Sequence, residues 1–182
     1  MTLSESALEV LDTLQPLSAQ QQRLRREFIQ HIGKNHDGWS RACLPDHLTA
    51  SAVVLDDTRR YALLGLHRKV GIWLQFGGHI EPTDSSLVAA AQREAVEESG
   101  IAALTFPGTG PLQLDRHAAP CGAGARHHLD VQFLALTRGC PRPVTSAESL
   151  DVRWWMLDDL PDLEPEMHEL IALARERLAQ SS

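Results

Sequence analysis

The sequence predicts an α/β protein in which a mixed β-sheet is sandwiched between helices. Strand-like apolar runs stand on both sides of one helical segment at 85–99, and an amphipathic helical pattern follows at 164–178. A further helical stretch at 3–33 precedes the first strand. Strands before and after a central helix favour a single sheet with helices packed on it.

Residues 1–46 are expected to form an N-terminal helical extension and connector, and residues 47–182 the main domain. The helical pattern at 3–33 is broken near Pro16, and its second piece starts at Ser18, which with Gln21 has the pattern of a capping box. Three roles for this helical hairpin stay open: packing on the domain, extending a substrate pocket, or providing the surface of a homodimer.

Short runs rich in apolar and β-branched residues predict the strands. They lie at 49–55, 61–67, 72–76, 112–117, 128–137 and 152–157. In the run at 128–137 apolar residues alternate with polar ones, as in a strand with one buried face. The central helix is expected to begin with Asp84 or Ser85 as its N-cap.

This central helix carries Glu94, Glu97 and Glu98 within one stripe about 100° wide. The remainder of the helix is largely apolar, which is typical of a packed helix. Three carboxylates at a low-dielectric boundary repel one another and are costly unless a cation neutralises them. Hard divalent cations such as Mg²⁺ prefer carboxylate oxygens and are often held together with substrate phosphates. The helix therefore predicts metal-assisted chemistry on a phosphorylated substrate.

The segment 77–101 reads GGHIEPTDSSLVAAAQREAVEESGI. It resembles the signature of the Nudix hydrolase family, G-x5-E-x7-R-E-U-x-E-E-x-G-U, where U is a bulky aliphatic residue. The half from Arg93 onward matches, with Ala95 smaller than usual. Counted strictly back from Arg93, the acidic and glycine positions fall on Ser85 and His79. One extra residue in the turn before the helix places Asp84 and Gly78 there.

The resemblance implies an α/β/α sandwich and hydrolysis of a diphosphate linkage in a nucleoside diphosphate derivative, with Mg²⁺ or Mn²⁺ as cofactor. It implies metal ligation by Glu94, Glu97, Glu98 and the backbone carbonyl of Gly78. Arg93 would hold a glutamate in position. The general base is left between a glutamate of the helix, such as Glu97, and Glu148 in the loop before the last strand. For Glu148 a role as a metal ligand or as a solvated loop acid also stays open.

Two residues outside the helix are candidates for substrate binding. His79 directly follows the glycine pair and is placed to reach a phosphate or a water. Arg126 ends a glycine-rich stretch and is placed to supply a cation for the distal phosphate. A structural or surface role is the alternative for each.

A net charge of −7 argues against a surface for a nucleic acid polymer. Cys43, Cys121 and Cys140 form no C-x-x-C pair and are expected to be free thiols in a reducing compartment. With no apolar run of membrane-spanning length, a cytoplasmic location away from membranes is expected.

Two other functions compete with hydrolysis. One is a catalytically inactive Nudix-fold module that binds a nucleotide or has a regulatory role, whose usual mark would be a broken glutamate triplet. The other is a diphosphate isomerase of the same architecture. Its chemistry uses a catalytic cysteine, and none of the three cysteines lies beside the signature.

Overall fold

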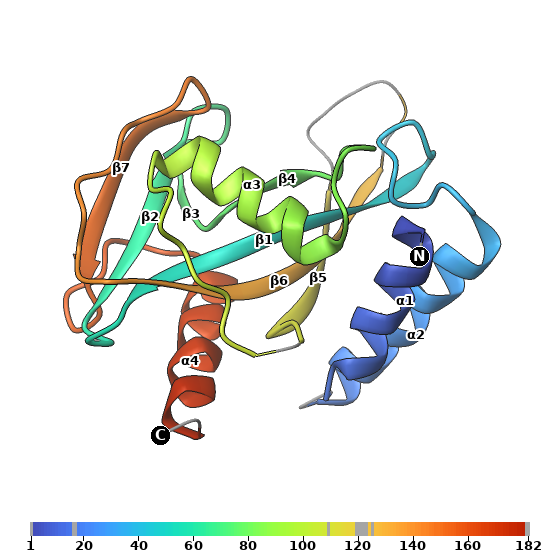
Figure 1. Ribbon diagram of the computed structural model, residues 1–182, viewed down its shortest axis with the longest axis horizontal. Coiled ribbons are helices and arrows are strands. Elements are labelled where there is room, and N and C mark those ends of the chain that lie inside the picture. Colours follow the sequence, from blue (N-terminus) through green and yellow to red (C-terminus); the bar gives the residue numbers. More distant parts are fainter. Residues whose placement is uncertain (1, 16–17, 109, 119–123, 125, 181–182) are drawn as a thin grey trace. The chain divides into compact units, whose positions relative to one another are not determined.

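The computed structural model describes residues 2–15, 18–108, 110–118, 124 and 126–180. Its strands form a mixed seven-stranded sheet flanked by helices, with the order β3-β2-β1-β6-β5, β4 paired with β1, and β7 paired with β2 (Figure 1). The predicted fold class, including the N-terminal helices, is confirmed. The expected boundary between residues 46 and 47 stays a prediction.

The chain groups into two compact units. The first contains Met1–Ser51, Gly78–Ala91 and Gly108–Phe133, and the second contains Ala52–Gly77, Gln92–Pro107 and Leu134–Ser182. Four elements have residues in both units: β1 (Asp46–Asp56), β4 (Phe76–His79), α3 (Leu87–Ser99) and β6 (His127–Thr137).

In the first unit, α1 (Leu3–Thr13) and α2 (Ala19–Lys34) form the predicted hairpin and lie side by side (Figure 1). Arg25 joins the two helices, because its Nε donates to the Leu11 carbonyl at 2.7 Å and its guanidinium pairs with Asp12 at 2.8 Å. Ser18 caps α2, because its hydroxyl oxygen accepts a hydrogen bond from the backbone N–H of Gln21 at 3.1 Å. This capping satisfies one of the unpaired amides at the start of the helix.

The side chain of Gln21 has a different partner from the one its capping-box spacing suggested. Its amide group donates to the Leu114 carbonyl at 2.8 Å and accepts from the Leu114 N–H at 2.9 Å. Leu114 belongs to β5 (Gln113–Ala118), so this pair of bonds attaches α2 to a strand. Of the three roles left open for the hairpin, packing on its own unit is the one these contacts describe.

In the second unit, β2 (Tyr61–His67) is the central strand. It pairs antiparallel with β1, with β3 (Trp73–Leu74) and with β7 (Ser149–Met156). The register with β7 shifts between Leu66 and His67, where His67 comes opposite Ser149. The predicted strand at 72–76 divides into β3 and β4 (Phe76–His79). The last helix, α4 (Pro165–Gln180), buries one apolar side as its pattern predicted.

The expected N-cap of α3 was wrong. Ser86 caps the helix, since its hydroxyl accepts from the Ala89 amide at 3.1 Å. Asp84 instead closes the preceding turn: its carboxylate accepts from the Glu81 N–H at 2.8 Å, and its own N–H donates to the Glu81 carbonyl at 2.9 Å. An aspartate used within a turn is not available to cap a helix two residues later.

The other end of α3 is fixed by Gly100, which has φ +70°. A left-handed residue just past the last turn is the usual way for a helix to end, and glycine adopts that conformation without strain. A Cβ at this position would lie 2.7 Å from the Cβ of Val144, so the glycine is also required by packing. Both constraints fix where the acidic stripe of α3 stops.

No helix among the described residues is both long and apolar enough to cross a membrane. Cys43 is buried and Cys140 exposed, and both are free thiols as expected. The prediction for Cys121 lies outside the described residues.

Candidate active site

Glu98 is the most deeply buried carboxylate of α3, with 7 % of its surface exposed. It is held by one strong contact: the Gly77 N–H donates to its Oε1 at 2.8 Å. Gly77 lies in β4, so this bond ties the helix to the glycine pair. Gly78, the predicted backbone ligand, is the next residue along the chain.

Burial raises the pKa of Glu98 to about 8, opposed by the Gly77 hydrogen bond and reinforced by the charges of Glu94, Glu148 and Glu97. Burial also raises the pKa of Glu94. Arg93 lowers this pKa through its hydrogen bond and its charge, whereas the charges of Glu97 and Glu148 raise it further. These acidic groups therefore share one electrostatic environment. Such an environment favours protonation of the carboxylates or binding of a cation.

Arg93 pairs with two of these carboxylates. Its Nη1 lies 2.8 Å from Glu94 Oε1 and 3.4 Å from Glu97 Oε2. The Glu94 side chain is 15 % exposed, whereas that of Glu97 is 59 % exposed. The pair with Glu94 is both shorter and less exposed to solvent, so it contributes more to positioning than the pair with Glu97. Arg93 thus holds Glu94 firmly and Glu97 loosely, leaving Glu97 accessible to solvent.

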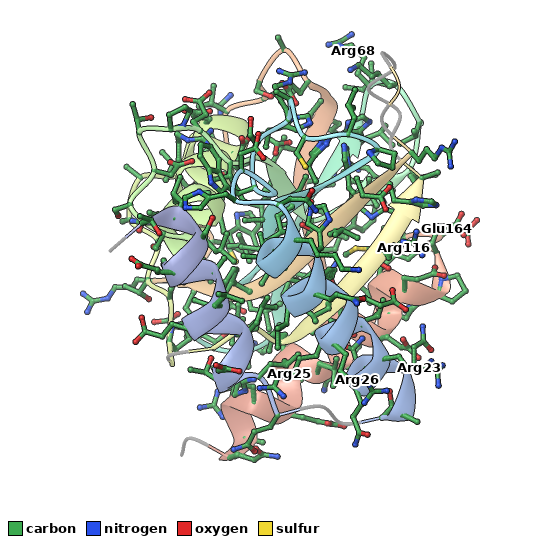
Figure 2. The ribbon with its side chains drawn as sticks, turned by 90° about the vertical axis from the view of Figure 1, so that its right-hand side faces the viewer. Arg23, Arg25, Arg26, Arg68, Arg116 and Glu164 are labelled. Carbon is green, nitrogen blue, oxygen red and sulfur yellow. The ribbon has the colours of Figure 1, made fainter. Side chains whose placement is uncertain are left out.

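Glu148 lies near this group although it is about fifty residues away in sequence from Glu98, since its charge raises the pKa of both Glu94 and Glu98. Arg68 fixes its turn: the Arg68 N–H donates to the Glu148 carbonyl at 2.9 Å. The guanidinium also donates to the carbonyls of Ala147 at 2.8 Å and Ser149 at 3.1 Å. Figure 2 labels Arg68 among the side chains. The Glu148 side chain itself is exposed.

In the first unit, His79 lies in a group of histidines. Its ring centroid is 5.1 Å from that of His47 and 5.2 Å from that of His128, and the rings of His47 and His128 are 5.0 Å apart. His117 adds a fourth ring, 5.3 Å from His128. Burial lowers the pKa of His128 to about 3, further lowered by the other histidines, so its ring is neutral near pH 7.

The histidines border a buried polar face that the sequence analysis missed. Asp130 is 3 % exposed and accepts hydrogen bonds from Thr49 at 2.9 Å and from Ser51 at 2.6 Å. In the sequence, this polar face is visible as a polar residue at every second position of two otherwise apolar strands. These residues are His47, Thr49 and Ser51 on β1, and His128, Asp130 and Gln132 on β6.

Arg126 is the remaining residue that was predicted to bind substrate. Arg126 is exposed, and its backbone N–H donates to the Pro45 carbonyl at 2.6 Å. Trp73 and Trp155 pack edge to face at 5.2 Å, and Arg153 lies 5.4 Å over the Trp155 ring. Arg23 and Arg26, both labelled in Figure 2, help to line a hollow on α2 that includes no predicted site residue.

The two groups differ in how closely their ligand atoms converge. In the described part of the chain, one group of three metal-ligand side chains, His47, His79 and His128, has ligand atoms within 4.8 Å of one another. The carboxylates of α3 are coupled by charge without converging to that degree. Their donor set of carboxylate oxygens nevertheless fits Mg²⁺ or Mn²⁺, which prefer oxygen. The raised pKa of Glu98 means that its charged form is costly without a positively charged partner.

A family model described as the NUDIX domain matches residues 45–174. The chain belongs to the NUDIX domain family. The match includes α3 and the loop of Glu148, so the acidic group described above lies within the family's domain. The N-terminal helical hairpin lies outside it. A search of curated proteins found no match.

Solved NUDIX structures share this fold. The NUDIX domain of Shewanella oneidensis NrtR, complexed with ADP ribose, is 25% identical, with a TM-score of 0.58 over 82% of this chain and 97% of that one. A C. elegans Ap4A hydrolase in a binary complex is 22% identical, with a TM-score of 0.60 over 73% and 98%. A NUDIX family hydrolase from Clostridium perfringens is 22% identical, with a TM-score of 0.55 over 75% and 98%.

Proposed function

We propose that this NUDIX protein is a divalent-metal-dependent hydrolase that cleaves a diphosphate linkage in a nucleoside diphosphate derivative, with water attacking phosphorus. The proposal rests on one observation above all. Glu98 is buried, yet it shares an electrostatic environment with three further carboxylates, and its pKa is raised to about 8. Binding of a cation would offset the cost of such an arrangement, and this supports the proposal.

Glu94, Glu97 and Glu98, with the carbonyl of Gly78, would hold Mg²⁺ or Mn²⁺. When bound, the ion neutralises charge on the diphosphate oxygens and lowers the pKa of a coordinated water. Contacts within the chain position two of these carboxylates. The Gly77 N–H fixes the Glu98 carboxylate, and Arg93 orients Glu94.

Glu97 and Glu148 are the candidates for the general base. Both are exposed, which suits a group that must receive a proton from water and release it again. The turn of Glu148 is tied to Arg68 by its backbone, which leaves the carboxylate available. We assign the base to Glu148, and a metal-binding role to Glu97, because Glu97 shares a helix face with Glu94.

The chemistry of the site and the named compounds of the relatives support one substrate class. The NrtR domain is complexed with ADP ribose and the C. elegans protein is an Ap4A hydrolase, and both ligands contain nucleoside phosphate anhydrides. A small diphosphate compound of this kind is therefore proposed here, with Arg126 contacting its distal phosphate. A cytoplasmic location, a homodimer and the absence of a nucleic acid partner stay predictions.

One observation favours a second candidate, a nucleotide-binding regulatory module. Shewanella oneidensis NrtR has also been solved with a 27mer DNA, and it is 27% identical with a TM-score of 0.53. The present chain covers only 62% of that regulator. The NUDIX domain of NrtR alone is complexed with ADP ribose, so the alternative proposed for this chain is binding of a nucleotide ligand. The intact glutamate triplet favours hydrolysis over this alternative.

The test is release of phosphate-containing products from a panel of diphosphates, including ADP ribose, dinucleoside polyphosphates and sugar nucleotides. Each is assayed with Mg²⁺, with Mn²⁺ and with a chelator. Cleavage of one class that the chelator abolishes is the expected result. Tight binding of a panel member without turnover under any metal condition would instead support the regulatory module.

A further inference from the structure

The three histidines of the first unit form a compact group built from three strands. His47 lies in β1, His79 in β4 and His128 in β6, and the sheet brings them together from positions far apart in sequence. Each offers one ring nitrogen, and these nitrogens lie within 4.8 Å of one another. The carboxylates assigned to Mg²⁺ belong to the other unit, so this group is separate in composition from that site.

The hydrogen bond of His47 determines which of its nitrogens is available. Its Nδ1 lies 3.3 Å from the Cys43 carbonyl oxygen. A carbonyl can only accept, so Nδ1 carries the proton and Nε2 presents a lone pair. Metal-binding histidines characteristically donate their second ring N–H to a carbonyl or carboxylate in this way, which fixes both tautomer and ring orientation.

The available nitrogen of His47 is buried and has no hydrogen-bond partner in the described residues. The whole residue is 0 % exposed. A buried polar atom left without a partner costs about 1–3 kcal/mol, and such atoms are uncommon in folded proteins. A ligand that supplies the missing partner would remove this cost.

The surroundings of the group resemble the outer layer of a metal site. His117, beside His128, is hydrogen-bonded through Nδ1 to Asp115 at 2.7 Å. Asp130 lies two residues after His128, on the same face of the strand, and is held by Thr49 and Ser51. Burial raises the pKa of Asp130, and a cation bound at the histidines would favour the ionised form of this acid.

We propose that His47, His79 and His128 together bind a transition-metal ion of the class that prefers imidazole, with Zn²⁺ the leading candidate. Imidazole nitrogen suits Zn²⁺, Ni²⁺, Cu²⁺ and Fe²⁺, whereas Mg²⁺ prefers oxygen ligands. With Zn–N bonds of about 2.0–2.1 Å, tetrahedral ligands lie about 3.4 Å apart. The three rings therefore close inward on binding, and a fourth position stays open for water. In this assignment the partner of His79 is a metal ion, not the phosphate or water that the sequence suggested.

The experiment uses the full chain carrying Glu97→Gln, stripped of metal by a chelator and then kept in excess Mg²⁺. Both measures reduce binding of the added ion at the carboxylates. Titration with Co²⁺, which absorbs visible light strongly in tetrahedral sites, is expected to show one equivalent bound. With Zn²⁺, X-ray absorption is expected to show imidazole nitrogens at about 2.0 Å, and the melting temperature to rise.

His128→Gln removes one proposed ligand, and His168→Gln, on the exposed side of α4, is the matched control. Zn²⁺ affinity is expected to fall by about 10²-fold or more in the first variant and to be unchanged in the second. Equal affinity in the two variants would overturn the assignment. An X-ray absorption spectrum with oxygen ligands alone, or a Co²⁺ titration with no bound equivalent, would also overturn it. These two readouts need no substitution among the three histidines.

Discussion

The Gly77 N–H donates to the buried carboxylate of Glu98 at 2.8 Å. This bond joins the two halves of the signature segment, the glycine pair and the acidic helix. The bond also offsets part of the cost of burying a carboxylate that is 7 % exposed.

Stability of the metal-free protein should depend on pH through Glu98. Its pKa is raised by burial from its ordinary value of 4.5 to about 8, so the folded state binds this proton more tightly than the unfolded state. The resulting stabilisation is complete below about pH 4.5 and is lost as the pH rises through about 8. Urea unfolding in a chelator at several pH values should show this decline, and Glu98→Gln should flatten it. An equal decline in the variant would contradict the assignment to Glu98.

Replacing Arg93 by Ala should lower kcat by about 10-fold or more, because Glu94 loses its 2.8 Å partner and the carboxylates lose their orienting cation. Lysine at this position should restore only part of the rate, since it lacks the planar fork of arginine. Arg175→Ala, on the exposed side of α4, is the control and should leave kcat unchanged. Full activity in Arg93→Ala would show that the pairing is only structural.

Glu148→Gln should reduce kcat by about 10²-fold or more if Glu148 is the general base, with little change in KM. It should also lower the pKa of Glu98, because the charge of Glu148 helps to raise it. Steady-state kinetics measure the first effect, and the pH dependence of unfolding measures the second. A shifted stability profile with unchanged kcat would place Glu148 near the metal but move the base to another residue.

Gly100→Ala should destabilise the protein by about 1–3 kcal/mol, since the residue has φ +70° and a Cβ would meet Val144 at 2.7 Å. Gly33→Ala is the matched control. Gly33 lies within α2 with open space around it, so alanine there should stabilise by about 0.5 kcal/mol. Chemical denaturation of both variants checks the opposite signs, and a neutral effect at Gly100 would contradict the packing argument.

The acidic site could be predicted from sequence because its pattern is local. Glu94, Glu97 and Glu98 share a stripe through helical periodicity alone, and the end of the helix at Gly100 is a residue-type signal. The structure adds the contact with Gly77 and the proximity of Glu148, which depend on strand pairing and on Arg68. The metal ligands and the base remain predictions.

The histidine group shows what sequence reasoning could not supply. His47, His79 and His128 come from three strands, and their meeting depends on sheet order and register. Alternation of polar residues along β1 and β6 was visible in the sequence, but without the pairing it did not indicate a shared face. The prediction of the α3 N-cap was wrong for a more local reason. The Asp84 carboxylate can accept from an N–H of the helix or from one of the preceding turn, and it accepts from Glu81 in the turn.

The central claim is that the carboxylates of α3 bind the divalent ion that drives diphosphate hydrolysis. The most direct test compares Glu97→Gln with Glu169→Gln, a glutamate exposed on α4, for turnover of the best panel substrate across a Mg²⁺ titration. We predict that Glu97→Gln loses about 10³-fold in kcat/KM with an unchanged melting temperature in a chelator, while the control retains full activity. Equal turnover and equal Mg²⁺ dependence in the two variants would contradict the account.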